Sequence, residues 1–275
     1  MENLIKGFKE NKAFRLSSIL VFLLLAITVL TPFIAPYDPL DAIIREANSA
    51  PSAAHLFGTD KLGRDVLSRI LYGASYSLTS VLGLVAVIFV VGTTLGVIAG
   101  YFGGVVDVVI MRIADMMISF PGIILAIAIA GILGGSLINA MIAMLCVTWT
   151  KYARLARSMV LKIKKRDFVD AAVVSGGSAL HILWVHILPN ILPLMIITAA
   201  ADIGAMMMEL AGLSFLGFGS QPPAPEWGLM LNEGRQQLQT APWLMFFPGL
   251  AIFITVVVFN LWGDSLRDVL DPRQD

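Results

Sequence analysis

The chain has 275 residues, of which 57% are hydrophobic and only 14% are charged, and its mean hydropathy is +0.83. An ordinary soluble domain is nearer half apolar and a quarter charged, so this composition predicts a membrane protein. The net charge is zero and no basic cluster of the nucleic-acid-binding kind is present, so neither DNA nor RNA is an expected partner. The single Cys146 allows no disulfide within the chain.

A basic segment, residues 1–15, precedes an uncharged first span, residues 16–36. The run is just long enough to cross a hydrocarbon layer of about 30 Å. A cleaved signal peptide would share the basic start, but the run is long and has no clear small-x-small cleavage site. We therefore expect an uncleaved anchor.

Residues 37–75 are rich in Asp, Arg, Pro and Ser, so we expect a loop or small cap on the outer side of the membrane. Its ionisable residues are expected to form a solvated charged surface, and its histidine to lie on that surface. They are His55, Asp60, Lys61, Arg64, Asp65 and Arg69.

Residues 76–263 hold five further apolar runs, which gives six spans in all. The second span carries Gly92, Gly96 and Gly100 at four-residue spacing, a pattern that lets another helix approach closely. The third, residues 105–133, contains Pro121 and a pair three residues apart, Arg112 and Asp115, for which we expect an ion pair within the helix.

The fourth span starts at residues 137–150 and is expected to continue into the cytosol from Lys151. The fifth covers about residues 191–215. The sixth, residues 243–262, is bounded by tryptophans suited to the membrane interface, and residues 264–275 form a short charged tail.

Between the fourth and fifth spans, within residues 159–190, polar residues interrupt the apolar sequence. Asp167 is expected to be the N-cap of a short helix, with Asp170 at the capping-box acid position. Gly176 then supplies the left-handed conformation that ends the helix, and Ser178 restarts a second helix. That helix is expected to run toward His186 and to be disturbed by Pro189 and Pro193.

Six spans place both termini on one side, and the positive-inside rule indicates the cytosol. With this orientation most Lys and Arg residues are inside. Only Arg45, Lys61, Arg64, Arg69 and Arg235 remain outside. The polar stretch before the fifth span is therefore expected to face the cytosol.

This stretch resembles the EAA loop of ABC-importer permeases, through Asp170-Ala-Ala, Gly176 and Leu188-Pro189; Asp170 stands where the family has glutamate. The segment from His55 to Ala74 resembles the dipeptide, oligopeptide and nickel branch, second permease type, as do Leu213-Ser-Phe-Leu-Gly and Ala241-Pro-Trp. The resemblance covers nearly the whole chain and is closest to the nickel members.

The resemblance implies an all-α, six-span type I importer permease with a cytoplasmic coupling helix. It implies pairing with a second permease, two ATPase subunits that bind ATP and Mg²⁺, and an extracytoplasmic solute-binding protein. The chain itself has no phosphate-binding or HExxH motif, so we expect no catalysis and no bound cofactor or metal. The implied ATPase-docking residues are Phe168, Asp170, Ala171, Ala172, Gly176, His186 and Pro189.

Asp202 lies near the middle of the fifth span, on one helical stripe with Met206 and Glu209. Because a lipid-facing carboxylate is disfavoured there, the stripe is expected to face an aqueous pathway or the other permease, and Asp202 to pair with a cation or meet a cationic cargo. We interpret these three residues as candidates for the translocation path.

The expected cargo is nickel or a nickel chelate, with di- or oligopeptides as the alternative. Two other classes of function compete with importer permease. An intramembrane enzyme would need converging catalytic groups inside the spans, and an ion-coupled carrier or channel would use the intramembrane acids without an ATPase.

Overall fold

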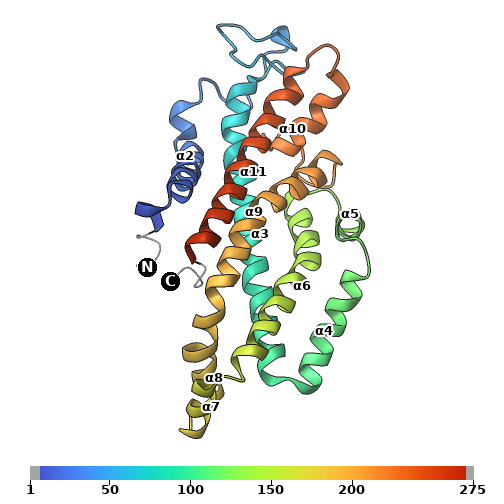
Figure 1. The fold of residues 1–275 in the computed structure, drawn as a ribbon. Helices are drawn as coiled ribbons and strands as arrows, with labels where there is room; N and C mark the ends of the chain where they lie inside the picture. The colour runs from blue at the N-terminus through green and yellow to red at the C-terminus, as the bar shows by residue number, and fades with distance from the viewer. Residues whose placement is uncertain (1–6, 271–275) are drawn as a thin grey trace.

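The computed structural model describes residues 7–270, and within them the fold is a bundle of helices without a named strand (Figure 1). Residues 1–6 of the expected N-terminal segment and 271–275 of the expected tail lie outside the described residues. The all-α prediction is confirmed. The elements are α2 (Lys12–Ile34), η1 (Ile44–Glu46), α3 (Val66–Phe102), α4 (Gly104–Ile118), α5 (Gly122–Leu133), α6 (Leu137–Ile163), α7 (Asp167–Val174), α8 (Ala179–Ile182), the π-helical η2 (Leu183–Ile187), α9 (Leu188–Phe215), α10 (Trp227–Gly234), η3 (Arg235–Gln237) and α11 (Trp243–Leu270).

Four of the described helical stretches are long and apolar enough to cross a membrane: α2, α3, the continuous stretch Ala179–Phe215, and α11. They correspond to the first, second, fifth and sixth expected spans. The third is not one straight helix, because α4 and α5 are bent by 92° at the break that contains Pro121. The fourth, α6, is too polar to be counted by composition, since its second half carries Lys and Arg residues.

Close packing of α3 on α6 forms the centre of the bundle. A Cβ atom on Gly92, Gly96 or Gly100 would collide with α6, at Tyr152, Ala153 and Val160 among other groups. The backbones therefore approach closely where the glycine spacing predicted it. On the other side of the bundle, α11 lies along α9 in the same manner.

The two ends of the bundle differ in character, as Figure 1 shows. At one end, residues 35–65 and α10 form a cap over the start of α3. At the other end, α7 and α8 extend beyond the remaining helices. The first residues of α2 and the last residues of α11 point toward the α7 end.

One expected boundary is wrong. The outer loop was expected to reach residue 75, but α3 already begins at Val66, with the Asp65 side chain accepting from the backbone N–H of Ser68. Pro189 and Pro193 were expected to disturb the helix, and the regular α-helix is indeed disturbed just before Pro189, but the helix does not end there. The π-helical turn η2 precedes Pro189, and such turns relieve the clash of a proline ring with the preceding turn, so the helix continues.

Candidate functional site

The segment expected to dock on the ATPase, residues 167–189 and called the docking segment below, is a helix, a glycine turn and a second helix that leads into α9. Arg166, not Asp167, occupies the N-cap position of α7, and no side-chain hydrogen bond caps the helix. The expected Asp167 cap is therefore wrong. Asp167 and Asp170 instead lie in the first turn, where carboxylates interact favourably with the positive end of the helix dipole.

The turn has the geometry that the sequence predicts. Gly176 has φ +81°, a left-handed conformation, and the N–H of Gly177 donates to the carbonyl of Ala172 at 3.0 Å. The Ser178 side chain then accepts from the backbone N–H of His181, which makes Ser178 the N-cap of α8. Beyond the turn, the His186 ring lies 6.1 Å from the ring of Phe168, so the two arms of the segment fold back on each other.

Large apolar side chains cover the surface of the docking segment. Only Val169 of α7 is buried, while Ala171 is exposed and Ala172 half-buried. Pro189 is exposed at the start of α9. The apolar tip, by which we mean the large exposed apolar residues of this segment, consists of Phe168 (44% exposed), Val173 (54%), Val174 (88%), Leu180 (68%), Trp184 (67%) and Val185 (51%).

Asp202 is buried and already paired within the chain. Its two carboxylate oxygens accept from Lys151 Nζ at 2.6 and 2.8 Å, and the hydroxyl of Tyr152 donates to the second oxygen at 3.0 Å. Met206 is buried in the core, and Glu209 is only partly buried. The structure thus gives Asp202 a cation from α6 of the same chain.

Lys151 and Tyr152 were missed as site residues. Lys151 was placed at the start of a cytosolic extension, whereas its ammonium group lies at the level of Asp202 in the bundle. The signal was available in the sequence, because residues 137–150 are too few to cross the membrane before Lys151.

Asp115 does not pair with Arg112. Its carboxylate accepts instead from Arg154 of α6, and the described residues show no ion pair for Arg112. A second arginine of α6, Arg157, binds Asp107 of α4 through two hydrogen bonds. Ion pairs therefore connect α4 to α6 rather than successive turns of α4.

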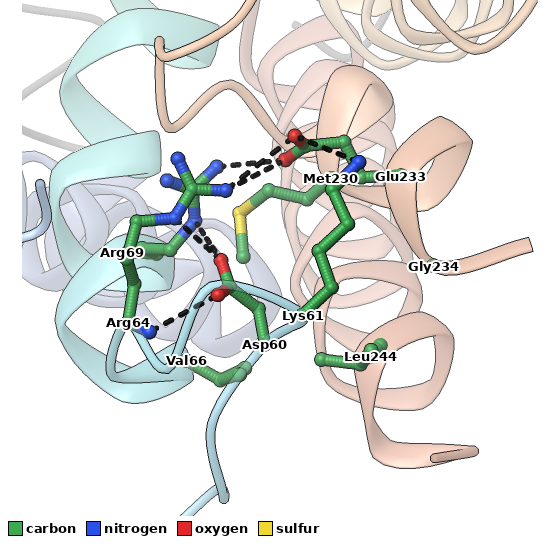
Figure 2. A pocket seen from close by; sticks show the side chains of 9 residues that line it. All are labelled: Asp60, Lys61, Arg64, Val66, Arg69, Met230, Glu233, Gly234 and Leu244. Atoms are coloured by element: carbon green, nitrogen blue, oxygen red, sulfur yellow. Dashed lines mark hydrogen bonds and ion pairs between the residues drawn. The ribbon is translucent and has the colours of Figure 1, made fainter. Parts of the chain in front are cut away.

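The charged residues of the outer loop are not a solvated surface, and that expectation is wrong. Arg64 and Arg69 are buried between Asp60 and Glu233 of α10, as Figure 2 shows. The Nε atom of Arg64 donates to Asp60 at 2.6 Å, and Arg69 Nη2 donates to Glu233 at 3.0 Å. Lys61 stays half exposed, near Glu233, and Asp38, Asp41 and Arg45 of the same loop are also exposed. The network holds the outer loop and α10 against the start of α3.

His55 is buried as well, contrary to the expected surface position. Its Nδ1 lies 2.9 Å from Asp65 and its Nε2 lies 3.1 Å from Glu46, so a carboxylate faces each ring nitrogen. Burial alone would lower the pKa of His55, but the hydrogen bonds and charges of Asp65 and Glu46 outweigh it and raise the pKa. The protonated ring then donates to both acids.

The bundle, with four described helical stretches long and apolar enough to cross a membrane, defines a multi-pass membrane protein. Residues 92–275 match the family described as binding-protein-dependent transport system inner membrane component, and residues 3–51 match the N-terminal TM domain of oligopeptide transport permease C. The chain belongs to this family of inner-membrane permease components of ABC importers, whose members are transport subunits rather than enzymes.

Curated relatives cover nearly the whole chain. The dipeptide transport system permease protein DppC of Alkalihalophilus pseudofirmus is 43% identical over 98% of this chain and 88% of its own. The nickel transport system permease protein NikC of Escherichia coli is 42% identical over 94% of each chain. The glutathione transport system permease protein GsiD of Pectobacterium atrosepticum is 43% identical over 94% of this chain and 86% of its own.

Among solved structures, the inward-facing MetNI methionine ABC transporter matches with a TM-score of 0.59 at 20% identity. The match covers 74% of this chain and 97% of that one. At this identity the match supports the fold. The importer-permease fold that the sequence resemblance implied is thereby confirmed, although the count of six spans is not fully confirmed, because α4 and α5 are bent and α6 is polar.

Proposed function

We propose that this chain forms one half of the transmembrane pathway of an ATP-driven, binding-protein-dependent importer, with both termini in the cytosol. A second permease supplies the other half. Two ATPase subunits bind ATP and Mg²⁺ and drive the cycle, and a solute-binding protein delivers cargo from outside. The chain itself binds no cofactor.

The apolar tip is the observation that carries this proposal. Six large apolar side chains are exposed on a segment that projects beyond the helices of the bundle (Figure 1). An exposed apolar patch at a projecting end is typical of a protein interaction surface. The turn at Gly176 joins it to a continuous 37-residue helical stretch, Ala179–Phe215, which would carry a movement of the tip into the bundle.

For the cargo, we propose a di- or oligopeptide, with nickel or a nickel chelate as the second candidate. Asp202, Met206 and Glu209 remain our candidates for the path. Met residues and a carboxylate favour a metal, but the ammonium of Lys151 balances the charge of Asp202, and the Met206 side chain is buried. A balanced pair suits a solute that carries both charges. Relatives named for dipeptide, glutathione and nickel transport are equally similar.

A charge on the apolar tip tests the docking proposal. Val174 is 88% exposed, so Val174→Asp costs the isolated subunit little stability but places a carboxylate in the interface. We expect less ATPase subunit to co-purify and ATP-driven uptake to fall at least tenfold. Thr240→Asp, exposed at the opposite end, is the matched control and should leave both unchanged. Normal co-purification and uptake with Val174→Asp would exclude this docking surface.

A further inference from the structure

One side of α6 carries three basic residues at three-residue intervals, each bound to a carboxylate on a neighbouring helix. One carboxylate belongs to α9 and two belong to α4. Positive and negative groups therefore alternate across this side, and their formal charges cancel. The six residues, which we call the ion-pair stripe, are Lys151, Arg154, Arg157, Asp202, Asp115 and Asp107.

The stripe lies beside an apolar helix. The opposite side of α6 packs on the glycine face of α3, and α3 has no charged residue after Arg69. At the inner end of α6, Lys164 donates to the carbonyl of Tyr101, close to the end of α3. Lys151 is thirteen residues farther along α6, which corresponds to about 20 Å of helix. The basic residues of the stripe thus lie about 10 to 20 Å from the inner end of α6.

Four of the six charged side chains of the stripe remain accessible in the single chain, whereas those of Asp202 (12% exposed) and Asp107 (17%) are mostly covered. The Lys151 side chain is 57% exposed, Arg154 and Asp115 are 45% and 50% exposed, and Arg157 is 34% exposed. Half-exposed charges facing lipid are strongly disfavoured, and membrane proteins direct such residues toward a water-filled cavity or another protein chain. A surface with charges of both signs over about two turns of helix suits the wall of a water-filled cavity.

We propose that the ion-pair stripe lines the inner half of the translocation path and recognises zwitterionic cargo, in which an ammonium and a carboxylate belong to one solute. This inference rests on the proposed importer function and specifies its cargo class. Half-exposed ion pairs are weak, so their partners can exchange. The half-exposed pair is Arg154 with Asp115. The cargo carboxylate binds the guanidinium of Arg154, an arrangement that favours two parallel hydrogen bonds, while its ammonium binds the released Asp115. A bare divalent cation is disfavoured on this surface, because each carboxylate of the stripe is paired with a basic residue that repels the cation.

Uptake of charge-modified peptides tests the recognition step. The complete importer, reconstituted with its ATPase and binding protein, is given L-alanyl-L-alanine or its C-terminal amide. Arg154→Gln removes a site for the carboxylate, so we expect uptake of the free dipeptide to fall at least tenfold and the slower uptake of the amide to change less than twofold. Arg267→Gln, an exposed arginine of α11 outside the stripe, should change neither.

Accessibility to a water-soluble thiol reagent tests the position of the stripe independently. In a Cys146→Ser background, Ser158→Cys adds a thiol one turn from Arg154 on the exposed side of α6. We expect the reagent to modify it, and excess L-alanyl-L-alanine to slow the reaction several-fold during turnover. Val90→Cys is the control. Val90 is 58% exposed in the uncharged part of α3, where we expect lipid to surround the helix, so its thiol should stay unmodified.

Three results would overturn the inference. They are full dipeptide uptake by Arg154→Gln, no modification of Ser158→Cys, or wild-type uptake of Ni²⁺ without uptake of the dipeptide. A different result would mark failure of the proposed function itself. In that case the wild-type complex assembles and hydrolyses ATP but accumulates neither the dipeptide nor Ni²⁺, and the inference falls with it.

Discussion

A substitution at Gly176 should change stability through backbone conformation alone. The residue has φ +81°, and no atom lies within 4 Å of the position that a Cβ would occupy. Gly176→Val therefore creates no collision, and its cost is conformational, about 1–2 kcal/mol for a left-handed residue with a Cβ. A cost of that size lowers the population of the native turn relative to alternatives by a factor of roughly 5–30.

Co-purification measures this change. At limiting ATPase subunit, we expect Gly176→Val to retain several-fold less ATPase than wild type and to recover when the ATPase is in excess. Gly176→Asn is the control, because asparagine adopts the left-handed conformation more readily than other non-glycine residues, so its loss should be smaller. Equal ATPase binding by wild type and both variants would refute the argument that the turn presents the docking segment.

Three further predictions address topology, the bundle interior and the outer cap. A cysteine introduced within residues 49–54 should react with a membrane-impermeant reagent on intact cells and one within residues 162–166 should not; the reverse pattern would reject the orientation. Asp202→Asn nearly preserves shape but leaves Lys151 without its counter-charge, so we expect impaired uptake at normal complex yield; full uptake would remove Asp202 from the path. The pKa of His55 is raised in the folded chain, so its stabilising effect is complete below about pH 6.5 and is lost as pH rises through the folded pKa. Hydrogen exchange in the outer loop, corrected for intrinsic rates, should therefore show less protection at high pH, and His55→Gln should abolish this dependence; an unchanged profile in that variant would exclude His55 as its origin.

The sequence was sufficient to predict the features that depend on residues close together in the chain. Long apolar runs located the first, second, fifth and sixth spans, and the spacing of Gly92, Gly96 and Gly100 indicated a face for close helix packing. The turn at Gly176 and the Ser178 cap follow from backbone preferences of single residues. Each of these depends on neighbours within a few positions.

Pairings between distant residues could not be predicted in the same way. Arg69 looked solvated because Glu233, its partner, is 164 residues away. Lys151 looked cytosolic because Asp202 is 51 residues away on another helix. A proline in an apolar run can mean a kink or a full break, so Pro121 did not reveal the 92° bend between α4 and α5.

The dependence of uptake on the ATPase tests the central claim most directly. Vesicles containing this chain and its partner permease are compared with and without the ATPase subunits, with binding protein, L-alanyl-L-alanine and ATP present. The account predicts accumulation only when the ATPase and ATP are both present. Accumulation in vesicles that lack the ATPase would contradict it and would indicate an ion-coupled carrier or a channel.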